Sequence, residues 1–185
     1  MLTPTLTDGV VVLDAFRPED VSAHLAGEDE ELARRFGWWP QRSTEAGVRA
    51  TIAGWRASWA DDGPTRALAM RWPDTAQLVG GSELRLGDDG VASMSWWVFP
   101  TARRTGLATR MVTLTVAHAF SSMGIARIEA LIEPSNTASR ALARRVGFSE
   151  EGVLRSRAIL AERRTDMVLA ALLPGEMKTA SAEQP

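Results

Sequence analysis

Cysteine and tyrosine are both absent from the 185-residue chain, and histidine occurs only twice. Without cysteine there can be no disulfide bond, thiolate metal site or cysteine nucleophile, which fits a reducing compartment. The two histidines, His24 and His118, do not have the spacing of a zinc site, so we expect no metal. We interpret both as surface or packing residues.

A basic leader and long apolar runs are also lacking. The first residues, MLTPTLTDGVVVLDAF, do not have the pattern of a signal peptide, and no segment approaches the roughly 20 apolar residues that span a bilayer. The formal net charge of −2 provides no global basic field to attract nucleic acid or anionic lipid. We therefore expect a cytoplasmic protein with no nucleic-acid or membrane partner.

The composition is that of an ordinary globular protein, 45% hydrophobic and 24% charged. We expect one domain at residues 1–174 and a polar, disordered tail at 175–185. Local patterns predict strands at residues 10–16, 66–72, 77–86, 91–99 and 127–133, and a hairpin between 153 and 173. Helices are expected at residues 28–36, at 107–123, after Pro18, after Ser43 or Thr44, and between Asn136 and Gly147. This order predicts a mixed α/β sheet flanked by helices.

Two strand patterns bear on a site. Gly80-Gly81 indicates a bulge or a close approach of another part of the chain. In the strand at 91–99 the side chains alternate between two faces. One face carries Ala92, Met94, Trp96 and Val98, and the other carries Ser93, Ser95, Trp97 and Phe99.

The segment that carries chemistry is the loop Arg103-Arg104-Thr105-Gly106-Leu107-Ala108, between a strand and a helix. A helix N-terminus offers unpaired N–H groups and partial positive charge, and glycine lets an anion approach the backbone. The loop therefore favours binding of a phosphate, and a pyrophosphate suits it well. It is neither a Walker loop nor a Rossmann fingerprint. The alternative is a basic turn that binds nothing specific.

The segment Ala92 to Thr109, ASMSWWVFPTARRTGLAT, resembles the signature of the GNAT N-acetyltransferase superfamily. In that family R/Q-x-x-G-x-G/A binds the pyrophosphate of acetyl-CoA, and Arg103-x-x-Gly106-x-Ala108 fits the pattern. A second match is Glu133-Pro134-Ser135-Asn136-x-x-Ser139, followed by Gly147-Phe148. A third and weaker match is the run from Glu151 to Arg155 with Asp166. The likeness is greatest to the branch of the ribosomal-protein N-terminal acetyltransferases.

The resemblance implies a mostly antiparallel sheet of about seven strands whose fourth and fifth strands splay apart. It implies acetyl-CoA as cofactor, with the pantetheine arm in the gap and a backbone N–H near Val98 polarising the thioester carbonyl, while the amine attacks directly. The residues it assigns to acetyl-CoA are Val98, Arg103, Arg104, Thr105, Gly106, Leu107, Ala108, Thr109, Asn136 and Ser139. Asparagine is also a favoured helix N-cap, which is the alternative reading of Asn136.

The acid–base groups of many family members are missing here. Ser93 stands where relatives place a glutamate, and Ala143 stands where some place a tyrosine. The replacements we consider are Glu83 as a base acting through water, Ser93 in a water chain, and Ser139 as a donor to the thiolate. Each has a plainer alternative: a solvated carboxylate for Glu83, a strand residue that lines the gap for Ser93, and a helix-surface hydroxyl for Ser139.

Tryptophan is abundant, with seven residues. Trp38 and Trp39 lie in a helix–helix loop that covers the acceptor in this superfamily, so they are candidate substrate-binding residues, or else a hydrophobic plug. Either Trp96, which is a candidate substrate-binding residue, or its neighbour Trp97 is expected to form a wall of the acyl pocket.

Three functions stay open. The first is an N-acetyltransferase for the α-amine of a protein or peptide, and the second is an acetyltransferase for a small amine. The third is a non-catalytic CoA-binding or sensing domain, which the missing acid–base groups suggest. The resemblance also allows a homodimer.

Overall fold

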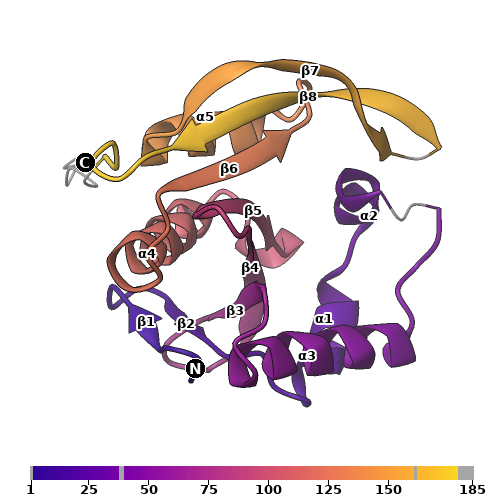
Figure 1. Cartoon of the computed structure of the whole chain (residues 1–185). Helices are drawn as coiled ribbons and strands as arrows, with labels where there is room; N and C mark the ends of the chain where they lie inside the picture. The colour runs from indigo at the N-terminus through magenta and orange to yellow at the C-terminus, as the bar shows by residue number, and fades with distance from the viewer. Residues whose placement is uncertain (1, 38–39, 161, 179–185) are drawn as a thin grey trace.

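The structure, a computed structural model, describes residues 2–37, 40–160 and 162–178. Within these residues one eight-stranded sheet, in the order β1-β2-β3-β4-β5-β6-β8-β7, is flanked by five α-helices (Figure 1). The strands are β1 (Leu6–Thr7), β2 (Val12–Asp14), β3 (Thr65–Arg71), β4 (Leu78–Leu86), β5 (Val91–Val98), β6 (Arg127–Ile132), β7 (Ser149–Leu160) and β8 (Arg163–Leu172). The helices are α1 (Asp20–Gly27), α2 (Glu30–Phe36), α3 (Glu45–Ala60), α4 (Leu107–Ser122) and α5 (Thr137–Val146).

The predicted fold class is confirmed, with one strand more than expected. The additional strand is β1, which pairs Leu6 with Leu13 across a turn at Asp8 and Gly9. The side chain of Asp8 accepts hydrogen bonds from the backbone N–H groups of Val10 and Val11. Residues 10 and 11 therefore belong to this turn and not to the strand predicted at 10–16.

The two faces of the sheet pack against different helices, as the alternation in β5 predicts. Trp97 and Phe99 lie in a buried cluster with residues of α1, α2 and α3, such as Ile52. Ala92 and Met94 lie in a cluster with residues of α4 and α5, such as Val116. The strand β5 therefore separates two layers of helices.

β5 and β6 part from each other soon after they meet. They pair in parallel only from Val91 opposite Arg127 to Ser93 opposite Glu129, although β5 continues to Val98 and β6 to Ile132. On its other edge, β6 pairs along its length with β8. The expected splaying of the fourth and fifth predicted strands is therefore confirmed, at β5 and β6.

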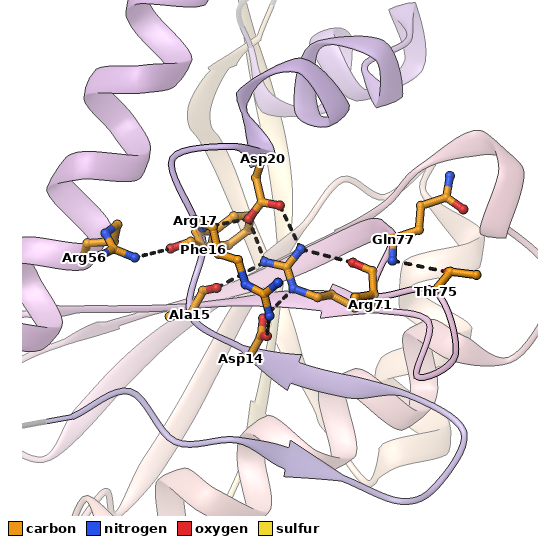
Figure 2. Close-up of polar contacts among 10 residues, drawn as sticks. Asp14, Ala15, Phe16, Arg17, Asp20, Arg56, Arg71, Thr75 and Gln77 are labelled. Atoms are coloured by element: carbon orange, nitrogen blue, oxygen red, sulfur yellow. Dashed lines mark hydrogen bonds and ion pairs between the residues drawn. The ribbon is translucent and has the colours of Figure 1, made fainter.

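A buried ion network fastens α1 to the sheet (Figure 2). The guanidinium of Arg71, on β3, donates to Asp14 at 2.6 Å and to both carboxylate oxygens of Asp20 at 2.7 and 2.8 Å. The Asp20 carboxylate also accepts the backbone N–H of Arg17 at 2.7 Å. Because Arg71 and Asp20 are both buried, each depends on the other to offset its lost hydration.

The end of the described chain packs against α5. The backbone N–H of Lys178 donates to Val146 O at 2.9 Å, and its ammonium donates to Arg144 O at 3.1 Å. Residues 179–185, the rest of the predicted tail, lie outside the described residues. None of the helices that the structure describes has the length and apolar character to cross a bilayer.

We expect Arg71→Met to lower the free energy of unfolding by about 3–5 kcal/mol, because it leaves the buried Asp20 carboxylate without its cation, whereas Asp14 keeps its ion pair with Arg17. Urea denaturation at pH 7 measures the change. Arg49→Met is the control, since Arg49 forms an exposed pair with Glu45 that contributes less than about 1 kcal/mol. Equal losses in the two variants would contradict a structural role for the network.

Candidate functional site

The loop at residues 103–108, here called the basic loop, begins with the N–H of Arg103, which donates to Pro100 O at 3.3 Å, and the amides that follow are free. Arg104 and Gly106 have positive φ values of 63° and 81°, and Gly106 caps α4 without any side-chain acceptor. Within the described part of the chain, the amides of residues 104–108 donate to no protein oxygen. Arg104, Thr105 and Gly106 are also exposed. Alternating backbone handedness and a free helix N-terminus are features that suit an anion, and binding of one at this loop stays a prediction.

A cavity of about 100 Å³ lies where β5 and β6 diverge, and we call it the strand gap. Its lining comes from α2, β5, β6, the β6–α5 loop, α5 and β8, and consists of Arg35, Phe36, Met94, Ser95, Trp96, Ala130, Leu131, Ile132, Glu133, Asn136, Ser139 and Met167. Phe99 donates its N–H to Val79 O on β4, so ladder alternation turns the N–H of Val98 away from β4 and toward β6. The structure thus brings an unpaired strand edge to the gap.

Asn136 and Ser139 lie together at the gap. The side chain of Asn136 accepts the N–H of Ser139 at 3.1 Å and caps α5. Asn136 is therefore an N-cap, the plainer reading, and at the same time a lining residue of the gap.

A second cavity, of about 440 Å³, opens on the other side of β5 and is here called the aromatic cavity. Phe36, Trp55, Trp97 and Phe99 form its apolar wall. Trp97 stacks on Trp55 with ring centroids 5.7 Å apart. Ser95 and Phe36 line both this cavity and the strand gap, so the two spaces meet there.

Gly81 provides the room for this wall. A Cβ at Gly81 would lie 2.7 Å from Cζ2 of Trp97 and 2.8 Å from Cζ of Phe16. The predicted close approach at Gly80-Gly81 is confirmed, and the register shifts beside it: Met70 faces Gly80 and Arg71 faces Leu78, so Val79 of β4 is the extra residue.

Glu83 reaches the aromatic cavity from β4, directly opposite Ser95 on β5. It is 6% exposed, so the reading of a solvated carboxylate is wrong. Trp55 Nε1 donates to its Oε2 at 2.6 Å, and Arg85 Nη2 lies 2.5 Å from its Oε1 as an ion pair without hydrogen-bond geometry. Oε2 is thus hydrogen-bonded, whereas Oε1 is ion-paired but buried without a hydrogen-bond partner among the described residues.

Three further polar groups in the cavity wall have buried atoms without a partner among the described residues. They are Nδ1 of His24, Oε1 of Glu28 and Nε1 of Trp97. Burial lowers the pKa of His24, against the opposing influence of Glu28 and Asp20, and so keeps the imidazole neutral near pH 7. Since such atoms are costly to bury unpaired, the wall is suited to a polar ligand with both donors and acceptors.

Sequence reasoning missed His24 and Glu28 as site residues. Their i, i+4 spacing on α1 was the available signal, but nothing local indicates that α1 faces Trp97 and Phe99.

The other predicted site residues fall in different places. Ser93 is exposed and lies where β5 and β6 are still paired, at the closed end of the gap. Trp96 lines the strand gap. Trp38 and Trp39 lie outside the described residues. Among the described residues no group of three or more His, Asp and Glu side chains is placed to hold a metal ion.

The chain is similar to known proteins in sequence and in fold. The family model described as "Acetyltransferase (GNAT) domain" matches residues 11–149. The Bacillus subtilis (strain 168) protein "Uncharacterized N-acetyltransferase YoaA" is 27% identical over 159 residues, which cover 82% of this chain and 86% of YoaA.

Two solved structures share the fold. Mycobacterium smegmatis RimJ, in complex with CoA-disulfide, has a TM-score of 0.83 at 24% identity. The match covers 96% of this chain and 89% of the RimJ chain. RimL, a ribosomal L7/L12 alpha-N-protein acetyltransferase in complex with coenzyme A, has a TM-score of 0.82 at 16% identity. The match covers 92% of this chain and 98% of the RimL chain.

We expect Gly106→Asp to weaken binding of coenzyme A, the cofactor that the resemblance implies, by at least about tenfold in calorimetry, because it sets a carboxylate among the free amides. The matched control is Gly124→Asp, at the other end of α4. Both glycines have positive φ, and a Cβ added at either would meet no atom within 4 Å, so the backbone strain is comparable. Equal weakening in both variants would contradict a cofactor site at the basic loop.

Proposed function

Because the chain belongs to the GNAT family of acetyltransferases and its relatives bind coenzyme A, we propose that it transfers acetyl directly from acetyl-CoA to a primary amine held in the aromatic cavity. The observation that carries this proposal is the junction at Ser95 and Phe36, where the aromatic cavity meets the strand gap. A thioester in one space and an amine in the other can meet there without a covalent enzyme intermediate.

The chain's own groups fit acetyl-CoA, which supplies the acetyl group as a thioester when bound. The free amides of residues 104–108 and the exposed Arg104 and Thr105 suit its diphosphate. The outward N–H of Val98, and that of Trp96 by the same alternation, are placed to donate to the pantetheine arm and the thioester carbonyl. Asn136 and Ser139 border the same path.

Transfer forms a C–N bond, breaks the C–S bond, and requires the amine to lose a proton while the thiolate gains one. Glu83 is the carboxylate opposite Ser95, but its Oε2 accepts from Trp55 and its Oε1 is paired with Arg85, so we assign it proton transfer through a water rather than direct contact. Ser139 is the hydroxyl at the gap that can donate to the thiolate. Ser93, at the closed end, is the weakest of these candidates.

The lack of a free strong base favours an α-amine as acceptor. An α-amine has a pKa of about 7.7–8.0, so roughly a third of it is unprotonated at pH 7.5, against about 0.1% of an alkylamine with a pKa near 10.4. One rim of the aromatic cavity is formed by the exposed residues Gln41, Arg42 and Arg85, where a chain attached to the amine can extend into solvent. We therefore propose the N-terminal α-amine of a protein or peptide, the kind of substrate that RimL's name gives.

A small-molecule amine is the second candidate. The cavity volume of about 440 Å³ is within the range of small-ligand pockets, and its aromatic wall suits a compact apolar amine. A homodimer remains a prediction.

For peptides with a free N-terminus we expect kcat/KM at pH 7.5 to exceed that for alkylamines by about 200–300-fold, following the difference in unprotonated fraction. The difference should narrow toward pH 9. Release of free thiol from acetyl-CoA, followed over an amine panel, measures both. Faster turnover of an alkylamine would favour the small-molecule acceptor, and tight CoA binding with no turnover of any amine would favour a sensor.

We expect Glu83→Gln to lower kcat by about 100-fold and to flatten the acidic limb of the pH–rate profile. The amide oxygen still accepts from Trp55, so the fold is kept. Glu28→Gln, in the same cavity wall, is the control and should leave the limb in place. If the Glu83→Gln profile matches that of the unmutated protein, the proton leaves by another route.

A further inference from the structure

The guanidinium of Arg103, which the family resemblance assigns to the diphosphate, is already occupied by protein groups. It donates to both carboxylate oxygens of Asp29, at 2.7 and 2.9 Å, and to Glu31 at 3.0 Å. Its Nε donates to Val98 O at 3.1 Å. A bidentate, charge-assisted pair with an additional carbonyl contact leaves little of this side chain free for a phosphate.

The carboxylate of Asp29 accepts hydrogen bonds from two different elements. Its carboxylate caps α2 by accepting the N–H of Leu32 at 2.9 Å, and it also binds Arg103. The hydrogen bond from Arg103 is the main reason that the pKa of Asp29 is lowered. The start of α2 is therefore tied directly to the basic loop, although the two lie more than seventy residues apart in the sequence.

The other end of α2 is tied to the opposite side of the strand gap. Arg35 forms an ion pair with Glu133 and donates to Ser135 at 3.2 Å, both in the loop between β6 and α5. Consequently α2 spans from the loop after β5 to the loop after β6. Between these anchors it presents Leu32 to the aromatic cavity and Phe36 to both cavities.

We propose that Arg103 is a positioning residue that holds α2 over the junction of the two cavities, and so couples the cofactor loop to the acceptor site. Arg104 and the loop amides are then left to bind the diphosphate. This inference rests on the proposed function for what the junction does, but the contact with α2 can be tested without an acceptor.

The chain offers matched variants. Asp29→Asn removes the negative charge but keeps a good N-cap, because asparagine caps helices as well as aspartate does. Arg103→Gln removes the other partner. Arg104→Gln is the control, since Arg104 is the exposed neighbour with no partner among the described residues. The Arg103 and Asp29 side chains are 29% and 30% exposed, so the variants should still fold.

We expect Arg103→Gln and Asp29→Asn each to raise KM for the amine about tenfold, the size expected for loss of a charge-assisted hydrogen bond, with less than about threefold change in the Kd of CoA. The double variant should be no worse than either single one. Arg104→Gln should have the opposite effect: it should raise the Kd of CoA and leave the KM for the amine unchanged. If Arg103→Gln raises the Kd of CoA as much as Arg104→Gln does, while Asp29→Asn changes neither the KM for the amine nor the Kd of CoA, Arg103 is a diphosphate ligand and the inference is overturned.

Hydrogen exchange of residues 30–36 provides the readout that does not depend on the acceptor. With CoA bound, we expect residues 30–36 to exchange faster in Arg103→Gln and in Asp29→Asn than in the unmutated protein. In Arg104→Gln these residues should exchange as in the unmutated protein. Unchanged exchange in the first two variants would overturn the inference even if an amine is acetylated. Faster exchange with no turnover by the unmutated protein would support the contact and refute the proposed enzyme function.

Discussion

Hydrogen bonding between β5 and β6 ends after Ser93 and Glu129, and most of this molecule's functional geometry depends on that early end. A parallel pair leaves no free edge where it is joined, so a strand edge that can bind an extended ligand exists only where the two strands part. β8 takes over the far edge of β6, which lets β6 diverge without leaving it unpaired on both sides. The outward N–H of Val98 and the lining of Asn136 and Ser139 follow from this divergence.

The opposite face of β5 carries a second consequence. Alternation places Ser95, Trp97 and Phe99 toward α1, α2 and α3, so the same strand that borders the gap also forms the floor of the aromatic cavity. The buried pairing of Arg71 with Asp20 anchors the start of α1, and this sets His24 and Glu28 against that floor. A charge network far from the junction thereby decides which polar atoms line the cavity.

Polar pairing inside the site limits what each residue can do. Glu83 accepts a hydrogen bond from Trp55 and is ion-paired with Arg85, and Arg103 is engaged by Asp29. Oε1 of Glu83 and atoms of His24, Glu28 and Trp97 are buried without hydrogen-bond partners among the residues described. The guanidinium of Arg103 is thus largely occupied, while several polar atoms around the cavity have unmet hydrogen bonds, and His24 and Glu28 among them belong to no motif. This contrast favours an acceptor that brings its own donors and acceptors and a readily deprotonated amine.

The sequence alone determined the features that arise within a few residues of one another. These include the helices and strands, the two faces of β5, and the turn with free amides at residues 104–108, because handedness at glycine and free amides at a helix start are local properties. The motif match likewise predicted the gap between β5 and β6. Only the tertiary structure decided which distant groups pair: Trp55 with Glu83, Arg103 with Asp29, and α1 with Trp97. Partner choice depends on how segments far apart in sequence pack, and local preference carries no information about it.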